Sequence, residues 1–243
     1  MTAVVILPGL DGTTALLETF CAALAAVGVS ARAVSYPTDC ALGYDELEPL
    51  VRAQLPSTTP FVLVGESFSG PLAIRVAAAP PPGLVGLVLS TTFARVPVPV
   101  LSPLAPLVRF APARPPMPLL VWSLLGRWAT PELQSQLAAA LHSVKPAVLR
   151  TRAAAAMRVD VSGLVPEVRL PVLQLVAADD RLLKPSAATA LAGALPSCRT
   201  FSVSGPHLLL QTATQACAKE VAAFSLGLGP NSSSKSPPLR GVA

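Results

Sequence analysis

Residues 61–70, FVLVGESFSG, carry an apolar run directly into a serine flanked by small residues. A sharp turn from a strand into a helix needs small residues on both sides of its tip, and such a turn can present a nucleophile. The segment fits the pattern G-x-S-x-G around Ser67, except that Ser69 replaces the second glycine. We predict Ser67 as the nucleophile. Ser69 is the rival, but it would put Pro71 where a small residue is required, so we expect Ser69 to be a packing residue.

A serine hydroxyl needs a base, and the chain contains only two histidines. His207 lies in the segment SVSGPHLLLQ, in a loop just after the last predicted strand. His142 lies inside the helical pattern LAAALHSV, where a surface or packing role is the better interpretation. We therefore predict His207 as the base.

The imidazole must be oriented by a carboxylate, which is expected on a loop after a neighbouring strand. The segment LVAADDRLLKP offers two aspartates directly after the apolar run PVLQLV. The residues that follow favour Asp180, and Asp179 is interpreted as a solvated turn residue. The predicted triad then occurs along the chain in the order Ser67, Asp180, His207.

An anionic intermediate needs hydrogen-bond donors, and the glycine-containing segment LPGLDGT, residues 7–13, could supply one. We predict an oxyanion hole formed by the backbone N–H groups of Leu10 and Phe68, the residue after the nucleophile. A phosphate loop is the alternative for residues 7–13. The segment lacks the spacing and the lysine of that motif, which disfavours this interpretation.

Other chemistries have little support in the sequence. The four cysteines form no C-x-x-C pair, and two histidines are too few for a typical imidazole metal centre, so we expect no metal and no cofactor. The segment after Met1 lacks the basic region of a signal peptide, and the apolar windows 96–108 and 115–126 are too short to span a bilayer. We expect a cytoplasmic protein with no transmembrane segment.

The elements that must position these residues follow an alternating rhythm. Short apolar runs alternate with helical patterns, which predicts an α/β fold: a mostly parallel sheet with helices on both faces. The predicted strands are 4–7, 31–36, 61–64, 84–90, 171–176 and 199–203. The predicted helices lie near 14–27, 44–55, 68–79, 186–194 and 212–224.

Residues 93–165 interrupt this rhythm with proline-rich sequence followed by two helical patterns that begin with proline. We predict that they form an inserted cap on a core of residues 1–92 and 166–226, with residues 227–243 as a disordered tail. Seven arginines and Lys145 against Glu132 and Asp160 give the insertion a net charge of 8 − 2 = +6. An acidic carrier protein or an anionic surface is a possible partner for it. Nucleic acid is not expected, because no basic motif with interleaved aromatic residues is present.

Four segments, LPGLDGT, GESFSGPLA, LVAADDRLLKP and GPHLLLQ, resemble the oxyanion loop, elbow, acid turn and histidine loop of the α/β-hydrolase superfamily. They occur in the same order, and the resemblance covers residues 4–226. The chain looks similar to compact bacterial serine esterases, including those that demethylate carrier-bound pimeloyl esters, and to plant plastid esterase and acyltransferase proteins. The resemblance implies an α/β-hydrolase fold with an inserted helical cap.

These features predict a carboxylic ester hydrolase that uses a Ser-His-Asp triad and an acyl-enzyme intermediate on a small-molecule ester, with an acyl or aromatic group under the apolar cap. Acyl transfer or thioester hydrolysis on the same triad remains open. A non-catalytic binding protein is the alternative of another class. Dehalogenase and epoxide-hydrolase chemistry is not expected, because those relatives use a carboxylate where this chain has Ser67.

Overall fold

A six-stranded sheet forms the centre of the computed structural model, which describes residues 2–96 and 115–228. Every neighbouring pair of strands is parallel, and the strand order is β2-β1-β3-β4-β5-β6. The strands are β1 (Ala3–Leu7), β2 (Ala31–Ala33), β3 (Phe61–Glu66), β4 (Leu84–Ser90), β5 (Val172–Ala177) and β6 (Cys198–Val203). The α/β fold predicted from the sequence is confirmed.

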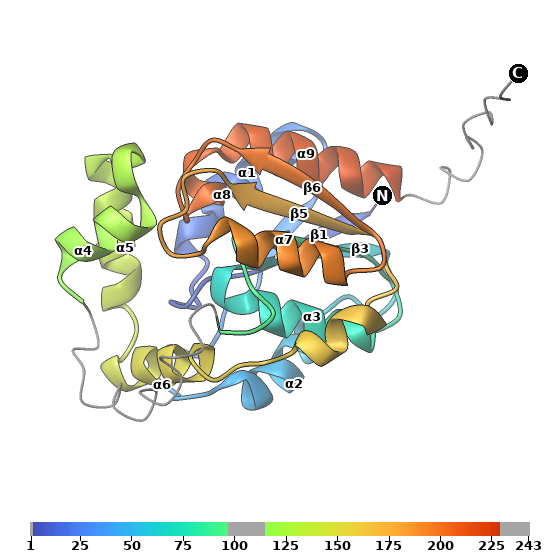
Figure 1. Cartoon of the computed structure of the whole chain (residues 1–243), viewed down its shortest axis with the longest axis horizontal. Coiled ribbons are helices and arrows are strands. Elements are labelled where there is room, and N and C mark those ends of the chain that lie inside the picture. Colours follow the sequence, from blue (N-terminus) through green and yellow to red (C-terminus); the bar gives the residue numbers. More distant parts are fainter. Residues whose placement is uncertain (1, 97–114, 229–243) are drawn as a thin grey trace, which may run out of the picture.

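Helices cover both faces of the sheet (Figure 1). Alternate side chains of each strand point to opposite faces, so Val4 and Ile6 belong to one apolar cluster while Val5 and Leu7 belong to the other. The first cluster is completed by helices α1 (Glu18–Ala26), α8 (Leu209–Thr212) and α9 (Thr214–Gly227). The second is completed by helices α2 (Tyr44–Gln54), α3 (Gly70–Ala78) and α7 (Pro185–Ala194). Burial on both faces explains why the central strands β1, β3, β4 and β5 are nearly continuous in apolar residues, whereas the edge strands β2 and β6 are partly exposed.

Further helices lie between β4 and β5, beside the carboxyl ends of the strands (Figure 1). They are α4 (Met117–Leu124), the 3₁₀ turn η4 (Gly126–Trp128), α5 (Pro131–His142) and α6 (Pro146–Ala156). The 3₁₀ segment η5 (Ser162–Glu167) also comes between β4 and β5 in the chain, but it packs against α3 and α7. Residues 97–114 of the predicted cap and 229–243 of the predicted tail lie outside the described residues. The carboxyl ends of parallel strands are where ligands bind in open α/β sheets, so the cap borders the expected site.

Strand β2 and helix α4 differ from the sequence-based expectation, and the short helix α8 precedes the helix predicted near 212–224. Strand β2 ends at Ala33 instead of residue 36, because the N–H of Tyr36 donates to the carbonyl of Gly12, 2.8 Å away, and the chain leaves the sheet edge. Helix α4 was not predicted, since residues 93–118 are rich in proline. Pro118 is tolerated there because it lies in the first turn of the helix, where its missing N–H would have no partner.

Within the described ranges, no helix is long and apolar enough to span a bilayer. The same residues contain no cluster of three or more side chains that could ligate a metal ion. All four cysteines are unpaired.

Candidate active site

Ser67 lies at the tip of a sharp turn between β3 and the 3₁₀ turn η2 (Ser67–Ser69), which leads into α3. Its φ of 48° is unusual for a residue other than glycine and is typical of a strained functional turn. A Cβ at Gly65 would approach the Ala73 Cβ to 2.7 Å, and one at Gly70 would overlap Thr92. Close packing therefore requires the small residue that the pattern places at Gly65, and it also requires Gly70, one residue beyond the pattern.

The three predicted triad residues form one hydrogen-bonded relay. The Ser67 Oγ lies 2.7 Å from the His207 Nε2, and the His207 Nδ1 lies 2.8 Å from the Asp180 Oδ2. The N–H groups of Leu182 and Leu183 donate to the Asp180 Oδ1 at 2.8 and 2.9 Å, which fixes the carboxylate. The side chains of His207 and Asp180 are only 1% and 8% exposed. In this geometry the carboxylate can hold the tautomer in which Nε2 accepts a proton from Ser67.

The alternative acid and base lie elsewhere. The carboxylate of Asp179 is partly exposed and lies 3.6 Å from the guanidinium of Arg127. His142 lies on α5, and its Nδ1 hydrogen-bonds to the carbonyl of Ala138 at 2.6 Å. Neither side chain belongs to the relay.

Ser69 is completely buried, and its hydroxyl is already engaged. It donates to the carbonyl of Pro8, and the hydroxyl of Tyr36 lies 2.6 Å from its oxygen. Since the single proton of Ser69 goes to Pro8, Tyr36 is the donor of the second bond. The residue expected only to fill space thus anchors the segment that follows β1.

Arg152, which the sequence analysis did not single out, holds the predicted oxyanion loop from the cap. Its side chain is fully buried although it belongs to α6. One guanidinium nitrogen donates to the carbonyls of Leu10 and Asp11 at 3.1 and 2.7 Å, and the other donates to Pro37 at 2.8 Å. Burial lowers the pKa of Arg152, while nearby Tyr36 and Asp11 oppose that shift.

The predicted oxyanion donors, Leu10 and Phe68, line the same cavity as Ser67 and His207. Phe68 is the second residue of η2, so its N–H is one of those that have no partner within the helix. The hydroxyl of Tyr44 donates to the Phe68 carbonyl at 2.8 Å, and the two rings stack with centroids 4.7 Å apart. The peptide after the nucleophile is therefore held on its far side.

The cavity beside Ser67 has a volume of about 430 Å³ and mostly apolar walls. This is within the range of small-molecule sites in enzymes. Leucines supply much of the wall: Leu16, Leu120, Leu124, Leu137, Leu141 and Leu149. The ionisable side chains among its described lining residues, apart from His207, are Asp11, Glu66 and Arg150.

Two buried carboxyl groups adjoin the relay without belonging to it. Glu66 is 2% exposed, and burial is the main cause that raises its pKa to about 7. Asp11 is 6% exposed, and burial raises its pKa as well, although hydrogen bonds from the N–H and hydroxyl of Thr13 oppose this. No sequence pattern had assigned a role to Glu66.

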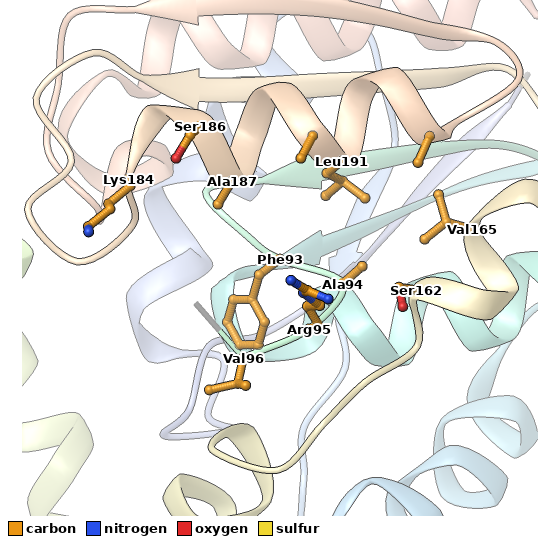
Figure 2. A pocket seen from close by; sticks show the side chains of 12 residues that line it. Phe93, Ala94, Arg95, Val96, Ser162, Val165, Lys184, Ser186, Ala187 and Leu191 are labelled. Carbon is orange, nitrogen blue, oxygen red and sulfur yellow. The ribbon is translucent and has the colours of Figure 1, made fainter. Parts of the chain in front are cut away.

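A second cavity of about 410 Å³ lies between α7, η5 and the segment after β4 (Figure 2). Phe93 lines both cavities, so its ring lies between them. Arg95 and Lys184 border the second cavity, whereas Ser67 and His207 are absent from its described lining. Of these two cavities, the first is therefore the one to which Ser67 and His207 belong.

The chain is similar to solved structures with several named activities. An enol-lactonase from Burkholderia xenovorans LB400 superposes with a TM-score of 0.77 at 16% identity, over 92% of this chain and 90% of that one. A thermophilic esterase from Thermogutta terrifontis gives 0.77 at 19% identity, over 94% and 90%. A bromoperoxidase from Bacillus anthracis gives 0.71 at 14% identity, over 93% and 91%. No protein-family model and no curated protein sequence matches the chain.

At 14 to 19% identity these likenesses concern the fold, which hosts unrelated activities. The narrower resemblance to pimeloyl ester esterases and to plant plastid acyltransferases stays a prediction. The parallel sheet, the flanking helices and the superpositions over nine-tenths of the chain agree on one architecture. The chain therefore has the α/β-hydrolase fold.

Proposed function

We propose that the protein is a serine hydrolase that cleaves carboxylic esters. The observation that carries this proposal is the continuous relay from the Ser67 Oγ through His207 to Asp180, which opens into an apolar cavity. A protein that only binds a ligand has no need of a strained serine with a base and an acid in line. The relay is the feature expected of acyl transfer to water.

In the proposed reaction the Ser67 Oγ attacks the ester carbonyl while His207 takes the hydroxyl proton at Nε2. The carbonyl oxygen becomes an oxyanion, for which the N–H groups of Leu10 and Phe68 are the proposed donors. The intermediate collapses, the bond to the alcohol breaks, and His207 returns the proton to the departing alkoxide. Water then repeats the cycle on the acyl-enzyme and releases the acid. Asp180 keeps its charge and stabilises the imidazolium in both halves.

The acyl group is proposed to occupy the cavity under α4, α5 and α6. Its walls are apolar, and a volume of about 430 Å³ leaves room for an acyl chain longer than acetate. The structures named an esterase and an enol-lactonase support a hydrolytic reaction on this fold, but they do not define the substrate.

The test is hydrolysis of p-nitrophenyl esters from acetate to palmitate by the wild type and by Ser67→Ala. We expect a maximum at one chain length and a fall in kcat of about 10⁴-fold or more in the variant, because the nucleophile is lost. Covalent labelling of Ser67 by a fluorophosphonate, read by mass spectrometry, provides an independent measurement.

The other outcomes separate the alternatives. Labelling of Ser67 without hydrolysis of any ester would point to acyl transfer or to another leaving group. If Ser67 is not labelled and no ester is hydrolysed, a serine hydrolase is excluded and a binding protein is the remaining alternative.

A further inference from the structure

Glu66 is a buried carboxyl group next to the nucleophile that the proposed reaction does not use. It is the last residue of β3, it immediately precedes Ser67, and it lines the same cavity. A carboxyl group that is 2% exposed destabilises the fold unless hydrogen bonds compensate for lost water. Its partners therefore indicate what the group does.

The Glu66 carboxyl group joins three segments of the site. The side-chain amide of Gln211, on α8, donates to its Oε1 at 3.0 Å. The carboxyl group also lies beside Gly9 in the oxyanion loop: a Cβ at Gly9 would be 3.9 Å from the Glu66 Oε2, and the Gly9 N–H favours the carboxylate. Gly9 directly precedes Leu10, and Gln211 follows His207 by four residues. One side chain thus ties the nucleophile turn to the proposed oxyanion donor on one side and to the base on the other.

The surroundings of Glu66 can accommodate either charge state. The donors Gly9 and Gln211 favour the carboxylate, whereas burial and the neighbouring carboxyl of Asp11 favour the neutral acid. Arg152 of α6 favours the charged form of Asp11, and Glu66 and the buried thiol of Cys217, on α9, interact electrostatically. Among the described residues, the Gln211 Oε1 is buried without a hydrogen-bond partner. Rotation of that amide would let its Oε1 accept a hydrogen bond from the O–H of neutral Glu66, so the tie to α8 persists in both states.

We propose that Glu66 is a positioning residue: through Gly9 and Gln211 it holds the N–H of Leu10 and the ring of His207 in alignment with Ser67. The proposal rests on the proposed function and adds a group that never touches the substrate's reacting atoms. Its effect falls on the transition state, because a misplacement of about 1 Å in a reacting constellation costs about 100-fold in rate.

The test compares Glu66→Ala, Glu66→Gln and Gln211→Ala, with rates referred to folded protein. Glu66→Ala removes both ties, and we expect kcat to fall about 100-fold while KM changes less than about threefold. Glu66→Gln keeps an acceptor for Gly9 and gains a donor for the free Gln211 oxygen, so kcat should stay within about fivefold of wild type. Gln211→Ala breaks one tie and should lower kcat about tenfold.

Gln174→Ala is the matched control. Gln174 is also buried, and its amide donates to the Ala188 carbonyl at 3.0 Å while its oxygen lies 3.3 Å from the Thr200 hydroxyl. Its loss should lower stability and leave kcat unchanged. If Glu66→Ala behaves like Gln174→Ala, Glu66 is only structural and the proposal is overturned. Equal losses in Glu66→Gln and Glu66→Ala would also overturn it, because charge and not the two ties would then matter.

A second readout keeps this proposal separate from ester hydrolysis. The rate of Ser67 labelling by a fluorophosphonate needs the same aligned nucleophile and oxyanion donors, but no ester. If Ser67 of the wild type is labelled but no ester is hydrolysed, only the proposal of ester hydrolysis is refuted. If Glu66→Ala is labelled as fast as the wild type, the positioning role is overturned. If Glu66→Ala does not fold, Gln211→Ala decides by the same measurement. Absence of labelling in the wild type would remove both proposals.

Discussion

Helices α6 and α4 belong to the same insertion, yet they contact the site in opposite ways. Arg152 of α6 is fully buried and donates to three carbonyls of the loops after β1 and β2. Helix α4 has no buried residue, and Leu119 and Trp122 are more than half exposed. Its described polar ties are few: the N–H of Leu208 donates to the Leu124 carbonyl, and Arg181 donates to that of Trp122, both at 3.0 Å.

This difference shows that the insertion is not one uniform cover. Helix α6 supports the backbone that is proposed to bind the oxyanion, whereas α4 supplies cavity wall through Leu120 and Leu124. Substitutions at the buried anchor of α6 should therefore change the rate for every substrate. Substitutions in α4 should change the preference among substrates.

The largest expected effect comes from Arg152→Ala. It leaves three carbonyl acceptors without their donor, and each buried unsatisfied group costs about 1 to 3 kcal/mol, so we expect a loss of at least about 3 kcal/mol in unfolding free energy. Release of the loop should also lower kcat/KM about 100-fold for short and long esters alike. Urea unfolding and ester hydrolysis measure the two effects.

Arg158→Ala provides the control, since Arg158 is an exposed arginine just beyond the end of α6. It should change neither quantity by more than a small amount. If Arg152→Ala keeps the kcat/KM of the wild type, α6 does not position the oxyanion loop. The contrast between the two helices would then disappear.

A second effect is a pH dependence of the protein's stability that arises from Glu66, which lies beside the oxyanion loop that α6 supports. Its pKa of about 7 in the folded protein exceeds its ordinary value of 4.5. Between these values the unfolded chain has lost the proton that the folded protein keeps, so stability falls as pH rises from about 4.5 to 7 and then levels off. At 1.36 kcal/mol per pKa unit this contribution is about 3 kcal/mol.

Glu66→Gln cannot titrate and should lack this fall. We therefore expect urea unfolding to show that the unfolding free energy of the variant, relative to that of the wild type, is higher at pH 8 than at pH 5 by a few kcal/mol. Parallel stability curves for the two proteins would mean that Glu66 ionises normally in the fold.

The smallest expected effect lies in α4. Leu124→Ala enlarges the cavity, and one or two methylene groups in an apolar pocket are worth about 1 to 3 kcal/mol, so the preferred p-nitrophenyl ester should become longer with about a tenfold change in relative kcat/KM. Trp122→Ala is the control on the same helix, because its ring is 56% exposed and absent from the described cavity lining. If Leu124→Ala lowers kcat/KM equally for esters of every chain length, α4 affects the rate for all substrates, as is expected of α6.

The sequence predicted the parts of the site that local patterns encode. The turn around Ser67 needs small neighbours for steric reasons that act within a few residues, so the pattern identifies it. Asp180 and His207 follow strands that end at the same edge of the sheet, and they were located by that rule. The residue roles remain predictions, although the structure brings all three side chains into hydrogen-bond contact.

The supporting residues could not be predicted, because their partners are distant in the sequence. Arg152 and the carbonyls of Leu10 and Asp11 are more than 140 residues apart. Arg150 and Arg152 lie on nearly opposite sides of α6, at about 100° per residue, but an alanine-rich helix does not reveal which side is buried. The count of +6 for the insertion likewise included Arg152, which adds no exposed charge.

Strands β4 and β5 pair directly, yet residues 91–171, 81 in all, lie between their ends. The entropy cost of closing a chain excursion grows only with the logarithm of its length, so doubling or halving it changes stability by about 0.6 kcal/mol. The segment that walls the substrate cavity can therefore be lengthened, shortened or exchanged with little penalty to sheet pairing, provided the Arg152 anchor is kept. This junction is accordingly a favourable position at which to graft a different cap and redirect the same nucleophile to a new acyl group.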